Sequence, residues 1–144
     1  MKKLIIAFVA IIACISSCEL EHSDNGKLDG MWHLVEIDTI ETGGTFDLSQ
    51  ELRFWSFQMR LIEMRDSYGR QVVVVCYFDH SGDSLHIYNP CVSNRDLGDV
   101  VLTTADTLRF YGVNSPTETF YVEKLTSGKM ILKSDLLRLM FKKH

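Results

Sequence analysis

The 144-residue sequence lacks the residue patterns that mark the common catalytic sites. No serine stands in the glycine pattern of a nucleophile elbow, and no glycine-rich loop is available to hold a phosphate. No two histidines have the i, i+2 or i, i+4 spacing of a metal-binding pair; the five are His22, His33, His80, His86 and His144. We therefore expect a protein that is not an enzyme and that holds neither a metal nor a cofactor.

Positive charge is also scarce. Lysine and arginine number 15 against 19 aspartate and glutamate residues, which gives a formal net charge of −4. Without residues 1–17, which carry Lys2 and Lys3, the net charge becomes −6. The basic residues are scattered and form no stripe with interleaved aromatic side chains. A nucleic-acid partner is therefore not expected, because nucleic acid requires a basic face.

The longest apolar run is too short to cross a membrane. Leu4 to Ile15 is 12 residues long, whereas a spanning helix needs about 20. Lys2-Lys3 precedes the run and the small residues Ser16-Ser17 follow it. A basic start, an apolar centre and a small-residue end are typical of a secretory signal peptide, here residues 1–17.

Ile15-Ser16-Ser17-Cys18 resembles the lipobox of bacterial lipoproteins. The resemblance implies that the Cys18 thiol carries a diacylglycerol, that cleavage occurs before this residue, and that its amine is acylated. Cys14 is a weaker alternative, because no pair of small residues precedes it. Each buried methylene contributes about 0.8 kcal/mol, so two or three acyl chains hold a protein on a membrane without further help.

The segment after the cysteine predicts a location and a tether. Glu19, where the resemblance would associate aspartate with inner-membrane retention, favours the outer membrane of the cell envelope and leaves open which face of it. Residues 18–27 are polar and predict a flexible tether, and residues 28–144 predict a single domain.

Alternating apolar and polar residues predict that this domain consists of strands. Trp55, Phe57 and Met59 alternate with polar residues within a predicted strand from Leu52 to Arg65 that has one buried face. The run Val72–Phe78 is rich in β-branched residues and predicts a central strand. A change of apolar phase between residues 34 and 35 indicates a β-bulge in the first strand.

The remaining elements complete an all-β fold. Thr103 to Asp106 resembles a capping box and Gly112 a helix stop, which predicts one short α-helix from Thr104 to Tyr111. Three strands with tight turns follow. Seven or eight antiparallel strands of this length predict a small closed up-and-down β-barrel.

Cys76 and Cys91 are the cysteines of the predicted domain. A regular hairpin turning near Ser81-Gly82 would place His86 opposite Cys76 and leave Cys91 several residues away. That register argues against a disulfide, unless the chain folds back at Pro90.

Gly30-Met31-Trp32 at the start of the first strand resembles the lipocalins and their bacterial lipocalin-like relatives, and the order of elements extends the resemblance from Leu28 to Lys143. It implies a lipocalin-like barrel in which Trp32 closes one end. In lipocalins proper the helix follows the last barrel strand, whereas here strands follow it, so no ligand residues are transferred from that family.

Three functions remain open. The barrel interior, lined by Trp32, Trp55, Phe57 and Met59, is a candidate site for a small apolar or amphipathic ligand, although side chains alone can fill a barrel of this size. A membrane-anchored barrel can also bind a protein, for example as a hydrolase inhibitor, with the predicted loop from Asn89 to Asp96 inserting into the partner. A structural role in the envelope is the third.

Overall fold

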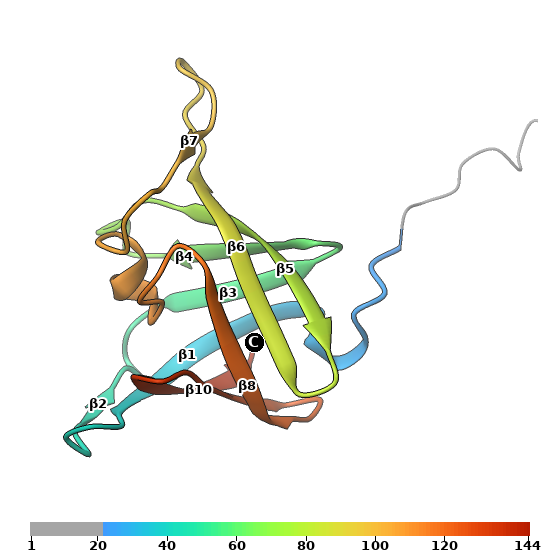
Figure 1. Ribbon diagram of the computed structural model, residues 1–144, viewed down its shortest axis with the longest axis vertical. Helices are drawn as coiled ribbons and strands as arrows, with labels where there is room; N and C mark the ends of the chain where they lie inside the picture. Colours follow the sequence, from blue (N-terminus) through green and yellow to red (C-terminus); the bar gives the residue numbers. More distant parts are fainter. Residues whose placement is uncertain (1–21) are drawn as a thin grey trace, which may run out of the picture.

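The computed structural model describes residues 22–144, so the predicted signal peptide and Cys18 lie outside the described residues. Ten strands and two short 3₁₀ turns make up this part of the chain (Figure 1). The strands are β1 (Gly30–Thr39), β2 (Thr45–Asp47), β3 (Arg53–Gln58), β4 (Leu61–Asp66), β5 (Val74–Ser81), β6 (Ser84–Val92), β7 (Val100–Val101), β8 (Glu118–Leu125), β9 (Lys129–Lys133) and β10 (Leu137–Lys143). No helix within residues 22–144 combines the length and apolar character needed to cross a membrane.

Eight of these strands close into an antiparallel barrel. The hydrogen-bonded order is β10-β9-β8-β6-β5-β4-β3-β1, and β1 pairs in turn with β10. The short strands β2 and β7 are additions to β1 and β6. The predicted all-β barrel is confirmed, and so is the bulge in the first strand, where the register with β10 shifts between Leu34 and Glu36.

The barrel has two different ends. One, which we call the terminal end, comprises the turns at residues 59–60, 82–83 and 126–128, the N-terminal residues 22–29 and the C-terminal His144. The other, the loop end, comprises the connections at residues 40–52, 67–73, 93–117 and 134–136. In Figure 1 the blue N-terminal segment leaves on the right, and the orange 3₁₀ turn of the loop end lies on the left.

Residues 52–65 form a hairpin, so the prediction of one strand is wrong. Strand β3 ends at Gln58, which pairs with Leu61, and the two-residue turn contains Met59 with a φ of 56°. Because Gln58 and Leu61 both face outward, the residues that point into the core change from odd numbers in β3 to even numbers in β4, namely Ile62 and Met64. Leu61 faces outward, but its odd number continued the apolar alternation of Trp55, Phe57 and Met59 in the sequence. No glycine or asparagine marked the turn between the two strands.

The predicted α-helix from Thr104 to Tyr111 is also wrong. Only the 3₁₀ turn η3 (Leu108–Tyr111) forms, and it ends at Gly112 with a left-handed φ of 87°. The Thr104 hydroxyl donates to the Asp106 carboxylate at 3.0 Å instead of capping a helix amide. Gly112 does end this turn, as the sequence predicts. A Cβ at this position would lie 2.8 Å from a methyl carbon of Leu139.

The register predicted for the cysteines is wrong as well. The β5–β6 turn pairs Ser81 with Ser84, so His86 lies opposite Asp79, and a bulge then places Cys91 opposite Val75. Cys91 therefore shares the outer face with Val75, whereas the adjacent Cys76 points into the barrel. Both are free thiols, and burial raises the pKa of Cys76 to about 12.

Candidate functional site

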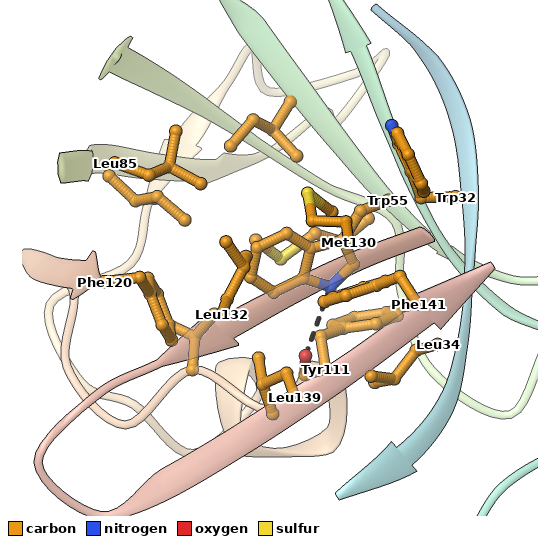
Figure 2. Close-up of a cluster of buried hydrophobic side chains, with 14 of the residues drawn as sticks. Trp32, Leu34, Trp55, Leu85, Tyr111, Phe120, Met130, Leu132, Leu139 and Phe141 are labelled. Atoms are coloured by element: carbon orange, nitrogen blue, oxygen red, sulfur yellow. Dashed lines mark hydrogen bonds between the residues drawn. The ribbon is translucent and has the colours of Figure 1, made fainter. Parts of the chain in front are cut away.

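Aromatic side chains fill the centre of the barrel (Figure 2). Trp55 is 0% exposed, and its ring centroid lies 5.1 Å from that of Phe141, 5.9 Å from that of Phe120 and 6.3 Å from that of Phe57. Phe57 in turn packs edge-on against Phe78 at 5.3 Å. These rings come from both halves of the chain, and their contacts cross the barrel axis.

The 3₁₀ turn η3 covers the loop end of this aromatic core. Trp55 Nε1 donates to the backbone oxygen of Tyr111 at 3.1 Å, as the dashed line in Figure 2 shows. The Tyr111 hydroxyl donates to the backbone oxygen of Val72 at 2.8 Å. Burial raises the pKa of Tyr111 to about 12, so this phenol stays a neutral donor at physiological pH. Hydrogen bonds thus connect the core, the 3₁₀ turn and the connection that precedes β5.

Trp32 covers the opposite, terminal end. Its ring is fully buried, and its Nε1 donates to the backbone oxygen of Leu28 at 2.8 Å. The Lys143 ammonium lies 4.3 Å from the centre of the same ring, within cation–π range. Trp32 therefore connects the N-terminal segment and the last strand at the point where the barrel closes.

The four predicted interior residues do not all lie inside. Trp32, Trp55 and Phe57 are buried, but Met59 is 40% exposed in the β3–β4 turn, so its assignment to the barrel interior is wrong. The prediction also left out of the interior other large buried side chains from the second half of the chain, namely Tyr111, Phe120, Met130, Leu132 and Phe141. The alternation in β8 and β10 marked several of them as buried, but only barrel closure brings them to Trp55.

A charged cluster secures the loop end. Asp66, whose side chain is 0% exposed, accepts hydrogen bonds from Arg70 Nε at 3.0 Å and from the Arg70 backbone N–H at 2.9 Å. Phe110 of η3 lies 3.8 Å from the Arg53 guanidinium carbon and 5.5 Å from that of Arg70. Arg53 also donates to the Phe110 backbone oxygen at 2.8 Å. This cluster joins the 67–73 connection to η3.

Asp66→Asn is expected to lower the free energy of unfolding at pH 7 by about 1–2 kcal/mol, because the buried carboxylate loses charge-assisted hydrogen bonds from the partly exposed Arg70. The hydrogen bonds from Arg70 hold the pKa of Asp66 below its ordinary value. A carboxyl with a lowered pKa stabilises the fold above its unfolded pKa, and this contribution is lost as the pH falls through the folded pKa. Urea unfolding should therefore show a difference between natural and variant chains at pH 7 that shrinks below about pH 4.

Exposed Asp96 offers a matched control for this prediction. Asp96→Asn is expected to change stability by less than about 0.5 kcal/mol at either pH. A difference for Asp66→Asn that stays constant between pH 7 and pH 3 would contradict the assigned role of the carboxylate.

Four hollows open on the surface, with volumes of about 590, 380, 300 and 290 Å³. Neither Trp55 nor Phe57 lines any of these four. The largest of these four lies between the β5–β6 turn and β8–β9, and its charged residues are Asp83, Lys133 and Asp135. Within residues 22–144 no three His, Cys, Asp or Glu side chains gather closely enough to hold a metal ion.

The connection from β6 to β7 projects beyond the barrel (Figure 1). Residues 89–92, predicted as loop, belong to β6, and Asn89 has a φ of 52° beside the bulge. Strand β7 then returns, with Val100 opposite Val92. Leu97 is 82% exposed, and Val100 and Val101 are 48% and 55% exposed. We call residues 93–101 the projecting hairpin; its apolar side chains are open to solvent.

Solved structures from two Bacteroides species share this fold. A lipocalin-like protein from Bacteroides uniformis superposes with a TM-score of 0.62 at 18% identity, covering 83% of this chain and 100% of its own. A protein from Bacteroides eggerthii gives a TM-score of 0.57 at 19% identity, covering 81% and 99%. No curated protein matches the chain. The family described as lipocalin-like domain matches residues 13–144, and the chain therefore belongs to the lipocalin-like domain family.

Proposed function

We propose that this protein is a non-enzymatic binding module, held by a lipid on Cys18 at a membrane of the bacterial cell envelope. Three observations support the anchor: the basic start, the 12-residue apolar run and the lipobox-like Ile15–Cys18. Glu19 after the cysteine favours the outer membrane. Membership of the lipocalin-like family supports a binding role, because this fold typically serves binding proteins.

The binding surface that we propose is the projecting hairpin, and the partner a protein. The observation that carries this choice is Leu97, which is 82% exposed on a segment that extends beyond the barrel. Exposed apolar side chains gathered on one projection are typical of interaction sites. A hairpin of this kind can insert into a groove of a partner, where burial of a leucine contributes about 2 kcal/mol.

A small apolar ligand in the barrel interior is the second candidate. The wholly apolar lining around Trp55 favours it, as does the family. However, aromatic rings are already in contact across the axis, and a ligand there would have to separate them or displace η3 with Tyr111. The projecting hairpin needs no such rearrangement, and we therefore place it first.

Leu97→Asp is expected to weaken capture of an envelope protein by about 30-fold, the equivalent of about 2 kcal/mol. The matched control is Leu136→Asp, which alters another exposed leucine at the loop end and should leave capture unchanged. Crosslinking on cells, followed by purification of the anchored protein, measures both. If the two variants capture the same proteins as the natural chain, the hairpin is not the binding surface, and a fluorescent fatty-acid analogue would then test the interior.

A further inference from the structure

The segment just after the predicted anchor lies against the barrel. Ser23 Oγ accepts the Met59 backbone N–H at 2.7 Å, and Asn25 Nδ2 donates to the Met59 backbone oxygen at 2.8 Å. Asp29 accepts the Asn25 backbone N–H at 3.0 Å, and Leu28 is fully buried. We call residues 23–29 the N-terminal strap. Its hydrogen bonds hold residues 23–27 on the terminal end, where the sequence predicts a flexible tether.

The last strand also holds the strap. Lys143 Nζ donates to the backbone oxygens of Asp29 and, at 3.2 Å, of Lys27. The strap is thus fixed to the β3–β4 turn on one side and to β10 on the other. Its first fixed residue, Ser23, is five residues from Cys18 along the chain.

We propose that the terminal end of the barrel faces the lipid headgroups and that the loop end, with the projecting hairpin, points away from them. This rests on the proposed lipid at Cys18. Five residues span at most about 17 Å, whereas the nine residues of β6 extend over roughly 30 Å. A barrel held by so short a connection cannot turn its loop end to the bilayer without detaching the strap. The ten-residue flexible tether would have allowed either orientation.

The distribution of charge favours the same orientation on an anionic bilayer. The terminal end and the strand ends beside it carry five exposed basic residues, Lys27, Arg60, Lys124, Lys129 and Lys142, against four exposed acidic residues, Asp24, Asp79, Asp83 and Glu123. The exposed charges of the connection at residues 93–117 are mainly acidic: Asp96, Asp99 and Asp106 against Arg95 and Arg109. Negative headgroups attract the first set and repel the second.

The test compares two probe positions on the full lipidated protein in vesicles of phosphatidylethanolamine and phosphatidylglycerol. In a Cys91→Ser background, Asp83→Cys places a fluorophore at the terminal end and Asp96→Cys places one at the loop end. Buried Cys76, with its raised pKa, does not compete for the label. We expect a quencher attached to the lipid headgroups to quench the probe at position 83 at least fivefold more than the probe at position 96. Equal quenching would overturn the proposed orientation.

A variant of the N-terminal strap tests whether the strap determines the orientation of the barrel. Ser23→Ala combined with Asn25→Ala removes both contacts with Met59, and the quenching ratio should fall toward one. Ser127→Ala, at an exposed turn of the same end, should leave the ratio unchanged. The mass of the purified protein and its flotation with vesicles report the anchor separately. A protein without acyl chains contradicts the proposed anchor and the orientation together, whereas a floating protein with equal quenching contradicts the orientation alone.

Discussion

Cys18→Ser is expected to abolish acylation of the protein and, with it, anchoring by acyl chains. In the proposed anchor the Cys18 thiol takes the diacylglycerol, and a serine hydroxyl does not replace that thiol, so the acyl chains are lost. Two acyl chains of about 16 carbons bury roughly 30 methylenes and stabilise attachment by on the order of 20 kcal/mol, which no surface contact of a small domain replaces. Cell fractionation and labelling with a palmitate analogue measure the loss.

Cys14→Ser provides the control, because Cys14 is the other cysteine of the N-terminal region. It should be lipidated and retained like the natural protein. If Cys14→Ser loses the label while Cys18→Ser keeps it, the predicted cleavage position is wrong. If both keep it, the proposed anchor is wrong.

Trp55→Ala is expected to destabilise the domain by about 4 kcal/mol. The change removes the ring that contacts Phe57, Phe120 and Phe141, and it also removes the donor that holds the Tyr111 backbone oxygen. Because small domains are stable by only about 5–15 kcal/mol, the melting temperature should fall by roughly 15 °C. Urea unfolding followed by tyrosine fluorescence and circular dichroism measures the effect.

Tyr121→Ala is the matched control, since Tyr121 is 53% exposed on β8 and its loss should cost less than about 0.5 kcal/mol. Trp55→Phe should lie between the two, because it keeps an aromatic ring and loses the hydrogen bond. A loss below about 1.5 kcal/mol for Trp55→Ala would show that the neighbouring rings collapse into the vacated space, and that the interior is less rigid than its contacts indicate.

The fold class could be predicted from local patterns because a barrel with one buried face repeats the same alternation in nearly every strand. Trp55 and Phe57 carry that signal in β3, and the phase change after Leu34 marks the bulge. Such features depend on neighbouring residues alone. They are therefore visible in the sequence before any strand is paired.

Pairing register was harder to predict, because it depends on turn positions that carried little local signal. The turn at Met59 uses a positive φ without glycine or asparagine, and a shift in the β5–β6 turn moved the expected partner of Cys76. A displaced turn changes the face of every residue after it. The error at Met59 has this origin, and so does the error for the two cysteines.

The candidate sites depended on tertiary contacts. The closure of the loop end by Tyr111 and the binding of the strap to Met59 join residues tens of positions apart. The polar residues of the strap read as a solvated tether because Ser23 and Asn25 find their partners only after the β3–β4 turn has formed. The exposed Leu97 was within reach of sequence analysis, but its projection from the barrel became visible only in the structure.

The pairing of β1 with β10 has a consequence for the order of folding. The first strand finds one of its two neighbours only in residues 137–143, about a hundred positions later in the chain. Until that strand arrives, β1 and β9 each present an open edge to any other chain nearby. Fold completion is therefore a late, non-local event, and contacts of such long range slow folding. When the seven-residue strand β10 pairs with both β1 and β9, it covers these two edges and closes the barrel. The edges through which the sheet could pair with another chain are then no longer free.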